Sequence, residues 1–329
     1  MKALHGVAAL TLLLGACTRS PEASPGDSVR AGMSASLVES QPAAVATARP
    51  VANPGTAMAT TAAAANAMHV ERVLLPVPPD SAIPAGPLGV SIRRGRALFE
   101  ATRDSLPANV GNRLRCLSCH LDGGRRANAS PLVGAFLSYP AYNARAARVY
   151  TIQDRINDCF RRSMAGRPLS SESAELRDMV SYLAFLSRGI ALGSEVKGQG
   201  IPKIEPLEPD TARGREIAAS TCARCHGENG GGTALAPPLW GAGSFGIGAG
   251  MARLRTAASF IRHNMPYDLP GTLTDQQAFD VAAYINSHSR PDLAGKENDW
   301  PNGDEPPDVA YPTRASRRHG AAGAIDRER

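Results

Sequence analysis

Apolar residues recur at helical spacing in four stretches of the chain, and these stretches form two similar pairs. The opening stretches, residues 95–99 and 214–218, each begin with a glycine. The closing stretches, residues 175–186 and 277–285, each carry a tyrosine. Before the second closing stretch, Thr274 and the glutamine three residues later have the spacing of a capping box. The pattern therefore predicts an internal repeat of two helical units.

A C-x-x-C-H run lies between the two helical stretches of each unit. The runs are Cys116-Leu-Ser-Cys119-His120 and Cys222-Ala-Arg-Cys225-His226, at an offset of 106 residues, and a Pro-Leu-x-Gly segment follows each one. This run is the attachment signature of a c-type haem. Both cysteine sulfurs bond to the porphyrin, and the histidine that follows is the proximal iron ligand. The sequence therefore predicts two covalently bound haem c groups.

The alternative explanations of these runs are a zinc site or a redox-active C-x-x-C. Zinc requires four ligands at finger-like spacing, and no such spacing is present in the sequence. The chain has 6 cysteines. Four belong to the two runs, Cys17 belongs to a lipoprotein-like segment, and Cys159 remains, so we expect no disulfide.

An opening helix, a haem motif, a loop and a closing helix together resemble a class I cytochrome c domain. The fold predicted here is therefore all-α, with two such domains in tandem, each wrapped around its haem. We expect the first haem domain over residues 88–190, a linker over 191–209 and the second haem domain over 211–290.

The sixth ligands of the two irons differ in this interpretation. Met265 follows His226 by 39 residues, and the same count from His120 reaches Cys159. Methionine is an ordinary haem ligand of cytochromes c, whereas a thiolate is unusual for an electron carrier. Met164 is the alternative ligand in the first domain. His263 and His288 are weaker alternatives in the second, because neither is in register with the repeat.

The two ends of the chain differ in composition from the haem units. Residues 1–17 resemble a lipoprotein signal peptide whose Cys17 receives the lipid, and residues 18–85 are rich in Ala and Pro without an apolar period, which predicts a disordered tether. A Pro-rich tail covers residues 291–329. We therefore expect a periplasmic protein held to a membrane, preferably the outer membrane, only by its lipid.

Positive charge is concentrated in the first haem unit. The net charge of the whole chain is +6, but residues 93–167 hold fourteen arginines against five acidic residues, whereas residues 213–290 hold seven against five. Arginine stays charged and offers fixed N–H donors to oxyanions. The first unit is therefore suited to a small dianion or to an acidic redox partner. Nucleic acid is disfavoured, since the basic region lacks interleaved aromatic residues.

The segment Arg155-Ile-Asn-Asp-Cys159-Phe-Arg-Arg-Ser163-Met164-Ala-Gly166 resembles the cysteine motif of tetrathionate-forming thiosulfate dehydrogenases, which are periplasmic dihaem cytochromes c. The resemblance covers residues 88–290. It implies that His120 and Cys159 ligate the catalytic haem, that Arg155 and Ser163 hold the substrate, and that Arg145 assists from an upstream loop. Ala165 departs from the asparagine usual in this motif. Asn264 replaces a lysine found in some members, so a plain His226 and Met265 pair is expected at the second haem.

The resemblance implies the oxidation of two thiosulfate ions to tetrathionate, a reaction whose reverse uses the same site. The electrons would leave through the second haem to an acceptor such as a cytochrome c. One alternative is a dihaem electron-transfer cytochrome without substrate chemistry. Another is the thiolate-ligated subunit of a multienzyme sulfur-oxidising complex. A dihaem peroxidase is disfavoured, because no clear distal acid or base is found.

Overall fold

The computed structural model describes residues 75–318 of the 329-residue chain. Cys17, the signal peptide and residues 18–74 of the expected tether lie outside the described residues, as do residues 319–329 of the tail. Within residues 75–318, no helix combines the length and apolar character needed to cross a membrane.

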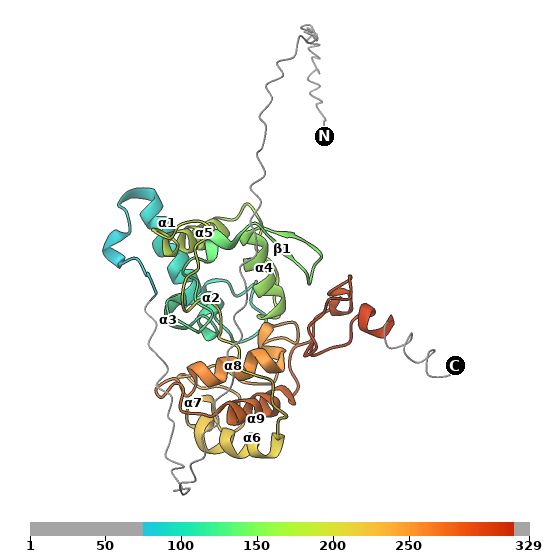
Figure 1. The fold of residues 1–329 in the computed structure, drawn as a ribbon. Helices are drawn as coiled ribbons and strands as arrows, with labels where there is room; N and C mark the ends of the chain where they lie inside the picture. The colour runs from blue at the N-terminus through green and yellow to red at the C-terminus, as the bar shows by residue number, and fades with distance from the viewer. Residues whose placement is uncertain (1–74, 319–329) are drawn as a thin grey trace, which may run out of the picture. The chain divides into compact units, whose positions relative to one another are not determined.

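The described chain is helical, with one small sheet (Figure 1). The first unit contains α1 (Gly86–Glu100), α2 (Thr102–Ser105), α3 (Leu121–Gly124), β1 (Ala141–Asn143), β2 (Arg148–Tyr150), α4 (Ile152–Arg162) and α5 (Ala174–Leu186). The second unit contains α6 (Thr211–Ile217), a π-helical turn (Ala218–Cys222), α7 (Ala223–His226), α8 (Leu254–Asn264) and α9 (Asp275–Asn286). Short 3₁₀ turns cover Asp80–Ala82, Cys116–Ser118, Ala135–Ser138, Gly250–Ala252 and Lys296–Asn298.

The closing helices α5 and α9 begin at side-chain caps and bury one face. Ser173 accepts a hydrogen bond from the backbone of Leu176 at the start of α5. The capping box expected at Thr274 is present, because this residue and Gln277 each accept the other's backbone N–H, at 3.2 and 2.8 Å. Tyr182 on α5 is fully buried.

A glycine allows each opening helix to cross its closing helix at close range (Figure 1). A Cβ added to Gly95 of α1 would lie 1.9 Å from the carbonyl oxygen of Asp178 on α5. A Cβ on Gly214 of α6 would lie 2.0 Å from the carbonyl oxygen of Asp280 on α9. Since no side chain fits at such distances, the repeated glycines fix the same helix crossing in both units.

A buried aspartate supports the same crossing in each unit. Asp178 lies 3.1 Å from Nε of Arg94, and Asp280 lies 2.8 Å from Nε of Arg213. Each arginine directly precedes the crossing glycine, and each aspartate lies one helical turn before the tyrosine of its closing helix. The two units are thus built by the same helix-packing device.

The two-stranded antiparallel sheet departs from the all-α expectation. Strands β1 and β2 pair Ala141 with Tyr150 and Asn143 with Arg148. The hairpin directly precedes α4. The hairpin brings the guanidinium of Arg148 to 4.6 Å from the centre of the Tyr150 ring, where the two form a cation–π contact.

Part of the expected tether and part of the Pro-rich tail, for which the sequence left packing open, are packed. Val77, Ala82 and Ile83, assigned from composition to the tether, pack against the first core. Part of the Pro-rich tail also packs, since Trp300 and Tyr311 are only 4% and 8% exposed. Both segments are held by apolar contacts with residues far away in the sequence. Such contacts leave no periodic signal in the sequence.

Candidate functional site

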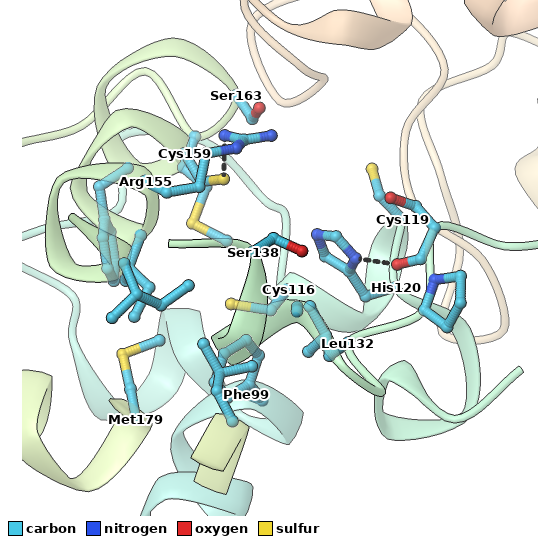
Figure 2. A pocket seen from close by; sticks show the side chains of 18 of the residues that line it. Phe99, Cys116, Cys119, His120, Leu132, Ser138, Arg155, Cys159, Ser163 and Met179 are labelled. Atoms are coloured by element: carbon cyan, nitrogen blue, oxygen red, sulfur yellow. Dashed lines mark hydrogen bonds between the residues drawn. The ribbon is translucent and has the colours of Figure 1, made fainter. Parts of the chain in front are cut away.

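The first C-x-x-C-H run lines a cavity of about 410 Å³. Cys116, Cys119 and His120 contribute to its wall, together with Cys159 and Arg155 from α4. The size lies within the range of about 300–1,000 Å³ that is usual for ligand and cofactor pockets. In Figure 2, His120 faces Cys159 and Arg155 from the other side of the cavity. The structure therefore brings most of the predicted site residues of the first unit together.

The imidazole of His120 is oriented by the Pro-Leu-x-Gly segment. Its Nδ1–H donates to the backbone carbonyl of Ser130, at 2.6 Å, and Ser130 directly precedes Pro131 (Figure 2). This bond leaves Nε2 as the metal-binding atom. Burial lowers the pKa of His120, which favours the neutral ring that a metal ligand requires. Burial also raises the pKa of Cys116 and Cys119 to about 12, so their surroundings suit uncharged thioether sulfurs.

Cys159 lies beside a positive charge. Nη1 of Arg155, one helical turn earlier on α4, donates to the Cys159 sulfur at 3.1 Å (Figure 2). The charge interaction with the neighbouring Cys159 raises the pKa of Arg155 above its usual range. The guanidinium is surrounded by protein but still faces the open space of the cavity. It can therefore stabilise a thiolate and offer its remaining donors to an anion.

Ser163 and Met164 also line this cavity. The carbonyl of Ser163 accepts hydrogen bonds from the Asn112 side chain and from the Gly246 backbone, at 2.9 and 3.1 Å. Met164 is only 3% exposed and belongs to the apolar core of the first unit. Cavity lining alone therefore does not separate Met164 from Cys159 as the iron ligand.

The interval of 39 residues after the histidine leads to different positions in the two units. Met265 is the residue directly after α8, whereas Cys159 lies inside α4, and Ser163 is the residue directly after α4. Counted back from the tyrosine of the closing helix, Met265 corresponds to Ser163. Between the histidine of the C-x-x-C-H run and the tyrosine of the closing helix, the first unit has four more residues than the second, about one helical turn. Cys159 and Ser163 thus lie one turn apart on the same side of α4, and both reach the cavity.

Arg145 is not brought to this cavity. It lines a second cavity of about 300 Å³, together with Arg148, Arg161 and Arg162. Its Nη1 donates to the carbonyl of Gly248 at 2.7 Å, and its guanidinium lies 4.5 Å from the centre of the Trp300 ring. The packed tail thus holds Arg145 away from Cys159, and a direct substrate contact expected for Arg145 lacks support in this geometry.

The second unit repeats the histidine geometry. Nδ1–H of His226 donates to the carbonyl of Pro237 at 2.7 Å, directly before Pro238. Cys222 and Met265 pack against one apolar cluster. His288 stacks on Trp240 with ring centres 4.2 Å apart and hydrogen-bonds the Tyr284 carbonyl through Nδ1. The sulfur and imidazole donors near Cys222 fit a haem with histidine and methionine ligands.

Comparison with known proteins agrees with the repeat. Residues 94–192 match the family model of the SoxA/TsdA cytochrome c domain, and residues 211–289 match that of cytochrome c. The chain is 44% identical over 240 residues to a thiosulfate dehydrogenase of Psychrobacter arcticus, a match that covers 71% of this chain and 73% of the relative. The chain belongs to the thiosulfate dehydrogenase family.

Other members of the thiosulfate dehydrogenase family give the same result. The Allochromatium vinosum enzyme is 44% identical over 238 residues, which are 69% of this chain and 88% of that protein. A solved structure of thiosulfate dehydrogenase TsdBA from Marichromatium purpuratum, in its as-isolated form, matches with 40% identity and a TM-score of 0.64. That match covers 70% of this chain and 52% of the longer TsdBA chain.

Some cavity residues of this thiosulfate dehydrogenase family member were not predicted from the sequence. Leu114, Ser138 and Tyr139 line the cavity, and Gln199 reaches it from the segment that follows α5. Leu114 and Tyr139 lie within a few residues of recognised motifs, so proximity in sequence could have indicated them. Gln199 carries no such signal, because its place depends on a hydrogen bond from its side chain to the Val133 carbonyl.

Proposed function

We propose that this protein is a dihaem c-type cytochrome that oxidises two thiosulfate ions to tetrathionate at the cavity lined by His120 and Cys159. The observation that carries the proposal is the Arg155 guanidinium, 3.1 Å from the Cys159 sulfur, across the cavity from a C-x-x-C-H histidine. Similarity to several thiosulfate dehydrogenases supports the substrate. The second unit would carry the electrons to an external acceptor such as another cytochrome c.

Each haem, when bound, supplies a one-electron acceptor, covalently held by Cys116 and Cys119 or by Cys222 and Cys225. The iron ligands would be His120 and Cys159 in the first unit and His226 and Met265 in the second. The chemical donors in both places fit this assignment, because imidazole, thiolate and thioether are all established haem ligands.

Thiolate chemistry at Cys159 accounts for the reaction. The sulfur of Cys159 forms a bond with the outer sulfur of one thiosulfate, and two electrons leave. The product, a cysteine S-thiosulfonate, carries one negative charge. A second thiosulfate then attacks the outer sulfur of this adduct, tetrathionate departs, and the thiolate is restored. Atoms and charge balance over the two steps.

Like-charge repulsion is the main barrier that the protein must lower. A thiosulfate dianion has to approach a thiolate, and a second dianion has to approach the adduct. Arg155 is placed to offset these charges, because it contacts the sulfur and faces the cavity. Preorganised donors of this kind act most strongly where water is excluded. Ser163, one turn further along, is placed to donate a hydrogen bond to a sulfonate oxygen.

We further propose that the protein is exported to the periplasm and anchored to the outer membrane through a lipid on Cys17. The support is the sequence of residues 1–17 alone, which lies outside the described residues. Globomycin treatment, which blocks lipoprotein signal cleavage, tests it. An unchanged precursor size and membrane fraction would refute the anchor.

The decisive experiment compares the wild type with Cys159→Met and Met164→Leu. We expect Cys159→Met to fold with two haems, to lose the low-spin thiolate signal in EPR, and to lose thiosulfate oxidation. Met164→Leu should keep both, since it conserves apolar volume in the core.

Thiosulfate oxidation that survives in Cys159→Met would refute the proposed mechanism. Two His/Met signals that change only in Met164→Leu would instead show a dihaem electron-transfer cytochrome. Copurification of a partner subunit that receives the sulfur would favour the subunit of a multienzyme complex.

A further inference from the structure

The chain around Met265 is hydrogen-bonded to the first unit on both sides. The side-chain amide of Asn264, which is 1% exposed, donates to the backbone carbonyl of Asn128 at 2.9 Å. Two residues after Met265, the hydroxyl of Tyr267 donates to the carboxylate of Asp122 at 2.6 Å. Two hydrogen bonds thus cross from one unit to the other within four residues of chain, and Met265 lies between them in the sequence.

Apolar packing joins the same two segments. Leu121 and Ala129 of the first unit form a small buried cluster with Phe260 of α8, and Met265 packs against this cluster. Leu121 directly follows His120, the histidine of the first C-x-x-C-H run. The residue that would complete the second haem site therefore packs in the same cluster as the neighbour of the histidine in the first.

The loop of residues 121–130, which receives these contacts, also orients His120. The carbonyl of Ser130, at the end of this loop, accepts the imidazole N–H at 2.6 Å. The backbone is in the left-handed region at Asp122, Asn128 and Ser130, with φ values of 54°, 64° and 50°. Non-glycine residues keep such a conformation only where the surrounding structure holds them. The bonds that Asp122 and Asn128 accept from the second unit are contacts of this kind.

We propose that Asn264 and Tyr267 are positioning residues, which hold Met265 at the second haem and brace the loop that orients His120 at the first. The inference rests on the proposed ligation of the second haem by Met265, and it is independent of the substrate oxidised at Cys159. It adds to the proposed function that neither haem site is completed within its own unit.

Replacement of Asn264 tests the buried contact. Imidazole added to the oxidised holoprotein displaces methionine from the iron and bleaches the methionine-to-iron charge-transfer band, so its affinity reports how firmly Met265 is held. We expect Asn264→Ala to raise this affinity about tenfold, the equivalent of one buried hydrogen bond. Asn286→Ala is the matched control, because the Asn286 amide donates to the carbonyls of Met251 and Ala252, each at 3.3 Å, within the second unit. It should bind imidazole as the wild type does.

A second variant tests the exposed contact without endangering the fold. Tyr267 is 55% exposed, and Tyr267→Phe removes the hydroxyl while the ring stays beside the guanidinium of Arg126, 4.7 Å from the ring centre. We expect the imidazole affinity to rise about two- to threefold, because an exposed hydrogen bond contributes less. Tyr142→Phe is the control, since the exposed hydroxyl of Tyr142 accepts a hydrogen bond from Asn302, at 3.1 Å, outside both loops.

The first haem gives a separate readout of the link between the units. Loss of the bond to the Asn128 carbonyl loosens the loop that orients His120. We therefore expect the low-spin EPR signal of the first haem to shift or broaden in Asn264→Ala and to stay unchanged in Asn286→Ala. A first-haem signal that is the same in both variants would overturn the link between the units.

The remaining outcomes separate this inference from the ligand assignment on which it rests. Equal imidazole affinities in Asn264→Ala and Asn286→Ala, beside a normal methionine band, would overturn the positioning role alone. A wild type without a methionine band would overturn the ligation by Met265, and the positioning role with it. Neither readout uses thiosulfate, so the proposed reaction does not bear on the result.

Discussion

The side chains of Arg155 and Cys159 project from the same face of α4, because they are four residues apart. This spacing allows the guanidinium to contact the sulfur from within α4, and Tyr139, in the loop before β1, interacts with the same guanidinium. A single helical turn thus places a cation at the point where two dianions would meet a thiolate. Positive charge thus lies directly at the Cys159 sulfur as well as over the whole first unit, which is rich in arginine.

Replacing Arg155 with glutamine tests this local role. We expect kcat/KM for thiosulfate to fall by about 100- to 1,000-fold, the usual loss when one preorganised donor is removed. Arg161→Gln is the control, because it removes the same charge from the same helix at a half-exposed position, 3.5 Å from Asp158. Initial rates at several ionic strengths measure both variants. Equal losses in the two would show that the general field of the unit, and not the contact with Cys159, assists the reaction.

The helix α4 is fixed at its first turn as well as by its packing. Thr151 and Asp154 form a capping box, with the backbone N–H of Thr151 donating to the carboxylate at 2.9 Å. Nη2 of Arg148, on strand β2, also lies 2.9 Å from Asp154. Since this carboxylate joins the hairpin to the helix, the orientation of the residues that line the cavity depends on it.

Acid titration should show the contribution of Asp154 to stability. The Arg148 guanidinium, assisted by Thr151, lowers the pKa of Asp154 from its ordinary 3.8 to about 2. A depressed carboxyl pKa stabilises the fold above the unfolded value, and this contribution is lost as the pH falls through the folded value. The difference in melting temperature between the wild type and Asp154→Asn should therefore be full above pH 4 and disappear near pH 2. Asp104→Asn, which removes an exposed carboxyl on α2, is measured beside it as the control variant.

Across the whole described chain, the packed tail is tied to the helix that carries Cys159. Asp299 accepts two hydrogen bonds from Arg162 of α4, at 2.6 and 2.8 Å, across 137 residues of sequence. Arg162 also contacts Asp158, the neighbour of Cys159, at 2.8 Å. The tail therefore belongs to the structure that positions the site, although it lies beyond the second haem unit in the sequence.

Removing one partner of this pair should be costly. Asp299 is 6% exposed, so Asp299→Ala leaves Arg162 buried with only Asp158 to offset its charge. We expect a loss of about 3 kcal/mol in the free energy of unfolding, the lower part of the range for a broken buried pair. Asp292→Ala breaks an exposed pair with Lys296 and should cost less than about 1 kcal/mol. Similar losses in the two variants, measured by denaturant unfolding, would contradict a structural role for the tail.

The sequence predicted those features that the repeat or a motif marks. Both C-x-x-C-H runs, the closing helices and the capping box at Thr274 follow local rules, and the comparisons confirm two cytochrome c domains. The hairpin β1–β2 was missed because each strand has only three residues. The packing of residues 77–83 was missed, and that of Trp300 was left open, because both depend on partners far away in the sequence.

The candidate site was predictable to a similar extent. Arg155, Cys159 and Ser163 lie in one short motif of the sequence, so they were predicted together. Arg145 lies in a loop, where side-chain direction depends on contacts with Gly248 and Trp300 that no local pattern encodes.

Leu114 lines the cavity of the first unit but packs in the apolar cluster of the second. The adjacent Arg113 donates its backbone N–H to Gly243. Domains generally fold in order as a chain emerges. Here the segment just before Cys116 gains its partners only after some 130 further residues have been added to the chain. The first C-x-x-C-H run therefore lies in a unit whose packing is completed only when the second unit has been made.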